Sequence, residues 1–256
     1  MCYLGRMELQ EILLLSAAFF VVATLYSTVG HAGASGYLAM MALIGLAPET
    51  MRPTALVLNI IVASFTVYRF RKARFFSWAG LWPFLLGSVP FAALGGIQSL
   101  SRGTYYVAMG IALLVASGYL VWRAFGARPI MEEGIVKVRK IPAVFMGCAI
   151  GFLSGLIGVG GGIFLSPILL ILGWAGPKTT AGISAPFILV NSAVALIAGS
   201  LTVQKLPAEL PLLAAAALGG AFLGTWLGLE RFRQKGLLTT LAIVMTLAGS
   251  KLLLTA

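Results

Sequence analysis

A run of glycine residues interrupts a hydrophobic stretch of this chain. Residues 158–167 read Gly-Val-Gly-Gly-Gly-Ile-Phe-Leu-Ser-Pro, and a related segment, residues 30–36, reads Gly-His-Ala-Gly-Ala-Ser-Gly. In a lipid bilayer, backbone that leaves a helix must be buried in protein or line a water-filled cavity, because lipid offers no hydrogen-bond partners. Two interrupted helices at corresponding places in two halves of a chain are typical of a transport site near the middle of the membrane.

The composition places the chain in a membrane. Hydrophobic residues make up 60% of its 256 residues and charged residues 10%, whereas a soluble domain has about 25% charged residues. The formal net charge of +11 does not indicate a nucleic-acid partner, because Lys and Arg gather in short loops, as the positive-inside rule requires. We expect the chain to act in or across the lipid bilayer.

The apolar segments predict an all-α polytopic membrane protein. A spanning helix needs about 20 apolar residues, and eight segments meet or approach that length: 12–29, 54–68, 78–97, 104–125, 141–157, 180–201, 208–229 and 236–255. Two shorter apolar segments, 37–46 and 163–172, follow the glycine-rich segments. With about 1.5 Å rise per residue, these two are too short to cross a bilayer, and we expect half-helices there.

The two halves of the chain repeat each other. Three glycines of the first half recur in the second at one constant interval, Gly30, Gly33 and Gly45 corresponding to Gly158, Gly161 and Gly173. Pro48 and Pro177 follow at nearly the same interval and are expected to end the half-helices. We divide the chain into a first transmembrane repeat (1–125), a basic cytoplasmic linker (126–140) and a second transmembrane repeat (141–256). Each repeat has a broken or re-entrant first element followed by three transmembrane helices.

The basic residues predict how the repeats are oriented. Lys and Arg cluster at 69–74, 123–140 and 231–235, and placing all three clusters in the cytoplasm lets the helices between them cross in pairs. The broken element 141–176 then begins and ends inside, and the broken element 12–47 begins and ends outside. The halves would form an inverted-topology repeat. If each broken element crosses the membrane once, the halves are parallel instead.

The second half carries a motif that extends beyond the glycine run. Residues 151–167 read Gly-Phe-Leu-Ser-Gly-Leu-Ile-Gly-Val-Gly-Gly-Gly-Ile-Phe-Leu-Ser-Pro, and residues 178–184 read Lys-Thr-Thr-Ala-Gly-Ile-Ser. This pattern, with the chain length and the duplicated half, resembles the TauE/SafE family of sulfite and organosulfonate exporters. The first half departs from it, with His31, Ala32 and Ala34 in place of Val159, Gly160 and Gly162. The resemblance implies a secondary transporter of the bacterial inner membrane, not an enzyme, that exports a small sulfur-containing anion.

The candidate substrate site consists of the two glycine-rich segments and nearby polar residues. The start of a half-helix has N–H groups without helical partners and the positive end of the helix dipole, so it binds an oxyanion without a charged side chain. Amide and hydroxyl groups suit an anion that must be released again. The candidate residues are Gly30, His31, Gly33, Ser35, Gly36, Thr54, Asn59, Gly158, Gly160, Gly161, Gly162, Ser166, Ser184 and Asn191.

Several of these residues also have a purely structural interpretation. Asn59 and Asn191 are equally compatible with hydrogen bonds between helices. His31, the only histidine, is a candidate proton relay or positive charge, or a neutral hydrogen-bonded core residue. Arg52 and Lys178 are candidates for drawing anions toward an entrance, or interfacial anchors.

Glycines elsewhere in the chain have a simpler explanation. Small residues let two helices approach closely in a membrane. Three consecutive glycines, in contrast, weaken a helix far more than packing requires, and we therefore assign the run at 158–162 to a site or its scaffold. Packing alone is the interpretation for Gly151, Gly155, Gly219, Gly220 and Gly224.

Other kinds of site fit the sequence poorly. Residues 33–36 match the GxSG pattern of intramembrane rhomboid proteases, but the only histidine precedes the serine in the same segment, and that chemistry needs the histidine on another helix. The glycine run fails the dinucleotide-binding pattern, and no Walker motif is present. Metal-ligand spacings are also absent. We therefore expect no cofactor and no metal.

The sequence leads to one main hypothesis and two alternatives. The hypothesis is a carrier that works by alternating access and holds a small anion between half-helix N-termini at the membrane midplane. Its partners would be the anionic substrate, the lipid bilayer and a coupling ion, H⁺ or Na⁺, while the oligomeric state is left open. The alternatives are a channel-like anion pore of the same fold, and a non-transporting membrane enzyme or assembly factor.

Overall fold

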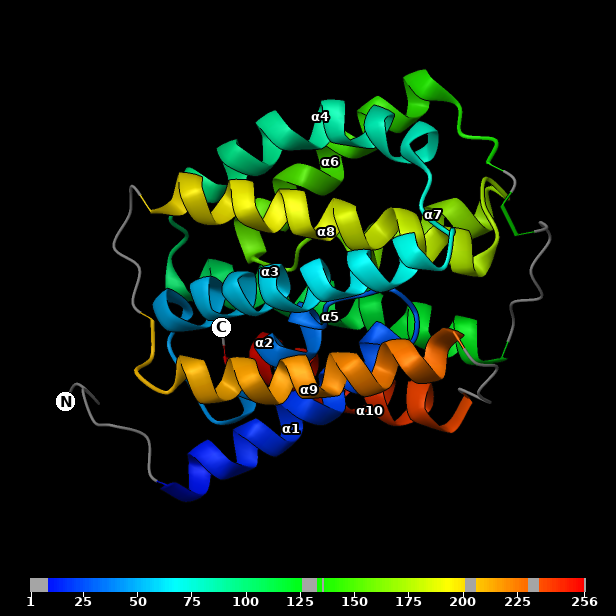
Figure 1. The fold of residues 1–256 in the computed structure, drawn as a ribbon. Coiled ribbons are helices and arrows are strands. Elements are labelled where there is room, and N and C mark those ends of the chain that lie inside the picture. Colours follow the sequence, from blue (N-terminus) through cyan, green and yellow to red (C-terminus); the bar gives the residue numbers. More distant parts are fainter. Residues whose placement is uncertain (1–8, 126–132, 135, 201–205, 230–234, 256) are drawn as a thin grey trace.

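The computed structural model of the chain describes residues 9–125, 133–134, 136–200, 206–229 and 235–255. The described part folds into α-helices (Figure 1). They are α1 (Leu9–Ser27), α2 (Ala34–Leu43), α3 (Pro48–Lys72), α4 (Trp78–Ile97), α5 (Arg102–Phe125), α6 (Lys140–Ile157), α7 (Gly162–Ile171), α8 (Pro177–Gly199), α9 (Leu210–Leu229) and α10 (Lys235–Thr255). The predicted all-α polytopic fold is confirmed.

The helices fall into long and short classes, as the apolar segments predicted. Within the described residues, seven helices are long and apolar enough to cross a membrane, namely α1, α3, α4, α5, α6, α8 and α9. The eighth predicted segment forms α10, which has 21 residues. In contrast, α2 and α7 have 10 residues each and are the short helices expected after the glycine-rich segments.

The prediction for Pro48 and Pro177 was wrong. Both prolines begin a long helix, α3 and α8, instead of ending a short one. Proline suits the first turn of a helix, because its fixed φ is helical and its missing N–H would have no partner there. The short helices end earlier, before Gly45 and Gly173, whose φ angles of 79° and 60° turn the chain toward the next helix.

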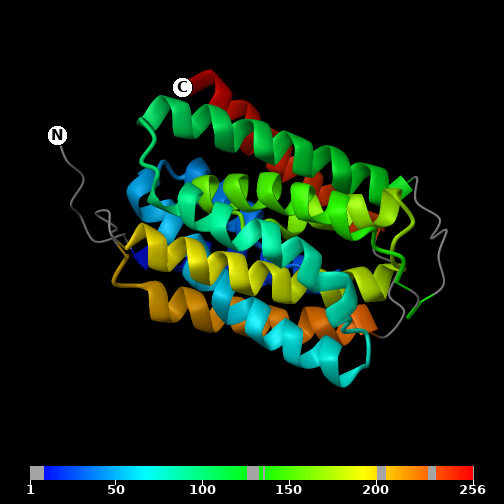
Figure 2. The same cartoon turned by 90° about the horizontal axis from the view of Figure 1, so that it is seen from above.

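The two halves of the sequence do not form separate lobes. The first helix of each half packs against the fourth described helix of the other half, α1 against α9 and α6 against α4. The helices α3 and α8 also pack against each other, as do α5 and α10. Figure 1 shows α1 beside α9 and α3 beside α8, and Figure 2 shows α4 beside α6 and α5 beside α10. The predicted repeats, 1–125 and 141–256, therefore stay a prediction about the sequence, and they do not correspond to two separately packed parts of the structure.

Glycines form the contact in both pairs that join the two halves, α6 with α4 and α9 with α1. A Cβ atom built on Gly151 of α6 would lie 2.4 Å from the carbonyl oxygen of Ser88, and one on Gly155 would lie 2.2 Å from that of Ala92. The other pair repeats this, since Gly220 and Gly224 of α9 meet the carbonyl oxygens of Phe20 and Thr24 at 2.2 and 2.1 Å. Any larger residue would push these backbones apart.

The packing interpretation therefore holds for four of the five glycines to which it was given. Gly219 is different, because a Cβ atom there would meet only the ring of Phe20, at an ordinary contact distance of 3.5 Å. Gly147 and Gly228 extend the two seams by one turn each, since their Cβ atoms would lie 2.3 Å from the carbonyl oxygens of Phe84 on α4 and of Thr28, directly after α1. The two seams hold α1 and α6 in place, and these helices lead into the glycine-rich segments.

Corresponding helices of the two halves run in opposite directions. In Figure 1, α3 and α5 run from left to right, and α8 and α10 run from right to left. The basic end of α3, with Arg69, Arg71 and Lys72, lies at the same end of the bundle as the start of α6. The inverted-topology repeat and the membrane sides of these ends stay predictions, which these directions support. Arg231 and Arg233 lie outside the described residues.

The seam between α4 and α6 can be tested with alanine. Replacing a helical glycine by alanine ordinarily stabilises a helix by about 1 kcal/mol, and we expect Gly118→Ala, which faces open space on α5, to keep or raise the melting temperature. Gly155→Ala should lower it, because overpacking costs about 1–3 kcal/mol. Thermal unfolding of the purified protein in detergent measures both. Equal melting temperatures would contradict the tight α4–α6 contact.

Candidate functional site

Two breaks interrupt the helical structure. The first break, residues 28–33, joins α1 to α2, and the second break, residues 158–161, joins α6 to α7. Glycines with positive φ occupy corresponding places, with 79° at Gly30 and 87° at Gly158, and with 102° at Gly33 and 80° at Gly161. Other residues are strained in this region, because their Cβ atom approaches the following carbonyl oxygen. The two halves thus share a backbone conformation.

Each short helix begins directly at a break. Gly33 immediately precedes α2 and Gly161 immediately precedes α7, and neither helix start has a side-chain cap. Helix α7 begins one residue before the predicted segment 163–172, and α2 begins three residues before the predicted segment 37–46. Because the first N–H groups of a helix have no partner within it, both breaks expose a positive, hydrogen-bond-donating helix end to the centre of the protein.

Each break packs closely against the long helix of the other half. A Cβ atom on Gly30 would lie 2.3 Å from the Cβ atom of Ala181 on α8, and a Cβ atom on Gly158 would lie 2.9 Å from the Cγ atom of Arg52 on α3. Glycine is therefore required at both places by space as well as by φ. The breaks lie where the two halves meet.

Asn59 of α3 holds the second break. Its Nδ2 atom donates hydrogen bonds to the Ser192 hydroxyl on α8 at 3.1 Å and to the Val159 carbonyl at 3.4 Å. A Cβ atom on Gly160 would lie 2.4 Å from the same Nδ2 atom. The Oδ1 atom of Asn59 is buried and has no hydrogen-bond partner within the described part of the chain. Asn59 therefore joins α3, α8 and the second break.

His31 joins the first break to α7 and α8. Its Nε2 atom lies 2.9 Å from the carbonyl oxygen of Gly162, the first residue of α7, and 3.1 Å from the Ser166 hydroxyl. The Ser166 hydroxyl in turn lies 2.8 Å from the Ser184 hydroxyl on α8. The first break is therefore in contact with the start of α7, the helix that follows the second break, and Ser166 continues the hydrogen-bonded chain to α8.

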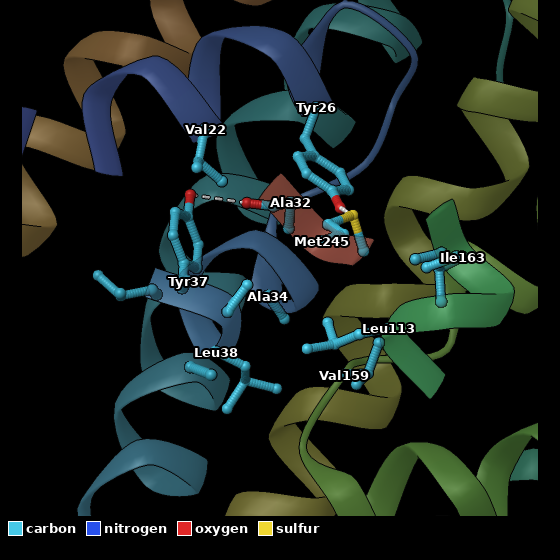
Figure 3. Packing of buried hydrophobic residues seen from close by; sticks show 14 of the residues in the cluster. Val22, Tyr26, Ala32, Ala34, Tyr37, Leu38, Leu113, Val159, Ile163 and Met245 are labelled. Carbon is cyan, nitrogen blue, oxygen red and sulfur yellow. Dashed lines mark hydrogen bonds between the residues drawn. The ribbon is translucent and has the colours of Figure 1, made fainter. Parts of the chain in front are cut away.

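Tyrosines that the sequence analysis missed support the first break. The Tyr26 hydroxyl donates to the Met245 sulfur at 2.9 Å and lies 2.6 Å from the Ser35 hydroxyl. The Tyr37 hydroxyl donates to the Ala32 carbonyl oxygen at 2.8 Å, the dashed line in Figure 3. A buried tyrosine needs a partner for its hydroxyl. Tyr26 and Tyr37 lie on either side of the first glycine-rich segment, and this position is the sequence signal that could have identified their role.

Two of the predicted polar residues turn toward their own helix. The Thr54 hydroxyl donates to the Thr50 carbonyl at 2.6 Å, and the Asn191 Nδ2 atom donates to the Phe187 carbonyl at 2.8 Å. Asn59 and Asn191 thus differ in role, although both lie in the helix that follows a half-helix. The neighbour of Asn191, Ser192, is the residue that reaches across to Asn59.

Arg52 and Lys178 both bind carbonyl oxygens at the end of a neighbouring helix. Arg52 donates from Nη1 to Gln98 at 2.9 Å and from Nη2 to Gly95 at 3.0 Å, at the end of α4. Lys178 donates from Nζ to Leu229 at 3.2 Å, at the end of α9. A cation there is stabilised by the negative end of the helix dipole. Their role at an entrance stays a prediction.

All fourteen predicted substrate-binding residues are buried in the structure. The predicted half-helix starts lie at the two breaks. Close to them lie the side chains of His31, Ser35, Ser166, Ser184 and Asn59. Among the residues that the structure describes, no group of three His, Cys, Asp or Glu side chains is placed to hold a metal ion. The arrangement offers hydrogen-bond donors and two positive helix ends, and it offers no carboxylate at the breaks.

The close contacts of the second break can be tested by comparing two glycines with the same φ of 79°. Nothing lies within 4 Å of a Cβ atom on Gly45, so Gly45→Ala should cost only the left-handed strain, about 1–2 kcal/mol. Gly160→Ala should cost about 1–3 kcal/mol more, from overpacking against Asn59 and Ser192. Thermal unfolding in detergent measures the difference. If both variants melt alike, the second break is not packed as described.

Comparison with known proteins agrees with this architecture. The family described as "Sulfite exporter TauE/SafE" matches residues 13–252. The "Probable membrane transporter protein y4hK" of Sinorhizobium fredii is 35% identical over 243 residues, which cover 93% of this chain and 97% of the relative. The "Probable membrane transporter protein YunE" of Bacillus subtilis is 25% identical over 226 residues, 80% of this chain and 81% of the relative. No solved structure matches the chain. The chain belongs to the TauE/SafE sulfite exporter family and is an integral membrane transporter.

Proposed function

We propose that this transporter exports a small sulfur-containing oxyanion, sulfite or an organosulfonate, across the bacterial inner membrane. The observation that carries the proposal is the contact between His31 of the first break and the start of α7, together with the absence of a side-chain cap at the starts of both α2 and α7. A helix start binds an anion through its N–H groups and its dipole. The family description, a sulfite exporter, supports the substrate class and the outward direction.

The side chains around the breaks suit an anion that must be bound and released. Hydroxyls of Ser35, Ser166 and Ser184 and the amide of Asn59 are buried there. They are bonded to one another, to the hydroxyls of Tyr26 and Ser192, or to backbone. Such neutral donors can exchange a protein partner for an oxyanion oxygen at small net cost, because one hydrogen bond replaces another. A fixed positive side chain would hold the anion more tightly and slow its release.

Alternating access follows from the burial of the site. Because the candidate residues are buried, a substrate reaches them only when helices move apart on one side. Inverted repeats achieve this by rocking one repeat against the other. The opposite directions of α3 and α8, and of α5 and α10 (Figure 1), support that mechanism. A channel-like pore of the same fold is the competing mechanism. Counterflow separates the two, because only a carrier uses the downhill movement of one anion to drive another anion uphill in the opposite direction.

The same substitution in the two halves provides a sharp test. We expect Asn59→Ala to lower anion flux by about tenfold, because it removes hydrogen bonds to the second break and to α8, worth about 1.4 kcal/mol together. Asn191→Ala should lower flux less, since its Nδ2 atom bonds to its own helix. Gly161→Leu should abolish flux, because it fills the start of α7. Efflux of radiolabelled sulfite and alkanesulfonates from proteoliposomes measures all three.

Folding and mechanism need separate controls in this assay. Size-exclusion profiles and melting temperatures show whether each variant is folded before its flux is compared. Saturable flux with counterflow is the result expected of a carrier. Flux that neither saturates nor shows counterflow would support the channel-like pore. The absence of flux for every anion, with folded wild-type protein, would contradict the proposed function.

A further inference from the structure

Asn59 leaves one hydrogen-bond acceptor unused at the second break. Its Nδ2 atom faces the Val159 carbonyl oxygen at 3.4 Å and the Ser192 hydroxyl at 3.1 Å. A carbonyl oxygen only accepts hydrogen bonds, so the contact with Val159 fixes which end of the amide is the nitrogen. The Oδ1 atom at the other end is buried and has no hydrogen-bond partner within the described residues. The whole side chain is buried, with 0% of its surface exposed.

This acceptor lies beside the chain that leads into α7. A Cβ atom on Gly160 would lie 2.4 Å from the Nδ2 atom of Asn59, and Oδ1 belongs to the same amide group. Gly160 is followed by Gly161 and then by Gly162, where α7 starts without a side-chain cap. The Oδ1 atom and the positive helix start therefore border the same short stretch of chain.

A deprotonated oxyanion does not suit this atom. An amide oxygen only accepts hydrogen bonds, and so do the oxygens of an ionised acid, so the two repel each other. The neighbouring hydroxyls of Ser166 and Ser184 differ, because a hydroxyl donates as well as accepts, and these two bond to each other. Buried polar atoms of native proteins are almost always paired, and an unpaired acceptor destabilises the protein. A partner for Oδ1 has to bring a hydrogen-bond donor.

We propose that the transported anion carries a hydrogen-bond donor besides its oxyanion group, and that Asn59 selects it. The start of α7 holds the oxyanion, and the Oδ1 atom of Asn59 accepts from the donor, which is a hydroxyl, an ammonium group or the proton of a partly protonated oxyanion. A site built to bond such a group rejects analogues that lack it, because the polar atom of the site is then left unpaired. This inference rests on the proposed anion transport at the breaks and narrows its substrate class.

Asn191 is the natural comparison, because it lies in the corresponding helix of the other half. Its Oδ1 atom is also buried without a partner among the described residues. Its Nδ2 atom, however, bonds to the Phe187 carbonyl oxygen of its own helix, whereas the amide of Asn59 is held against the second break. The inference therefore concerns Asn59 alone.

Two sulfonates of nearly equal shape provide the test. In hydroxyethanesulfonate a hydroxyl group replaces the terminal methyl group of propanesulfonate, so the pair differs in one hydrogen-bond donor. Each radiolabelled anion is supplied to proteoliposomes at the same concentration, below saturation, so that the ratio of initial uptake rates is the ratio of kcat/KM. Liposomes without protein give the leak, which is subtracted. We expect the wild type to prefer hydroxyethanesulfonate about tenfold, the effect of one buried hydrogen bond.

Asn59→Leu keeps the approximate shape of the side chain and removes both of its polar atoms. The lost bonds to Val159 and Ser192 should slow both anions alike, while the preference for hydroxyethanesulfonate should fall from about tenfold to about one. Ser192→Ala is the matched control, because it removes one partner of Nδ2 and leaves Oδ1 in place. We expect it to slow both anions and to keep the preference, and we expect Asn191→Ala to keep the preference as well.

The outcomes separate the inference from the proposed function. Equal uptake of both anions by the wild type, or faster uptake of propanesulfonate, overturns the role of Asn59 but keeps anion transport. A preference that persists in folded Asn59→Leu, or that disappears in Asn191→Ala, also overturns it. If no sulfonate or sulfite is transported, the proposed function fails and the inference fails with it. Should Asn59→Leu not fold, the ratio is measured in Asn59→Ala, and if neither folds, the ratios of the wild type and of Asn191→Ala decide the question.

Discussion

The structure depends on one constraint, which is that backbone leaving a helix inside a membrane must be enclosed by protein. Both breaks meet it in the same way, by packing against the long helix of the opposite half, Gly30 against Ala181 and Gly158 against Arg52. Only glycine allows the positive φ and the close approach together. The enclosure brings the first break next to the start of α7, and a membrane protein gains a positive helix end there without placing a charged side chain in it.

The glycine seams make that enclosure possible. Gly151 and Gly155 place α6 directly on the backbone of α4, and Gly220 and Gly224 place α9 on the backbone of α1. Each seam joins a helix of one half to a helix of the other, so the helices that lead into the breaks are fixed by the opposite half. Small residues are the usual means of close packing in a membrane, where no hydrophobic effect drives helices together.

The polar groups at the breaks form small hydrogen-bonded sets. His31, Ser166 and Ser184 link the first break to α7 and α8, and Asn59 links the second break to α3 and α8. Hydrogen bonds between buried polar groups favour one arrangement of those groups. In the transport mechanism that we propose, an anion inserted among these groups would change several hydrogen-bond partners at once and so bias the packing of whole helices.

The sequence by itself determined the helices and their breaks. Hydrophobic length and glycine spacing identified eight long segments, two short helices and the repeated positive-φ positions, because these features arise from local backbone sterics and from the thickness of the bilayer. It also indicated the packing role of Gly151 and Gly155.

Only the tertiary structure decided which polar groups meet. Asn59 donates a hydrogen bond to the second break, while Asn191 bonds to its own helix. The sequence analysis did not identify Tyr26 and Ser192, which also form hydrogen bonds at the site. Helix rotation and the exchange of α1 and α6 between halves set these contacts, and both depend on long-range packing that no local pattern encodes.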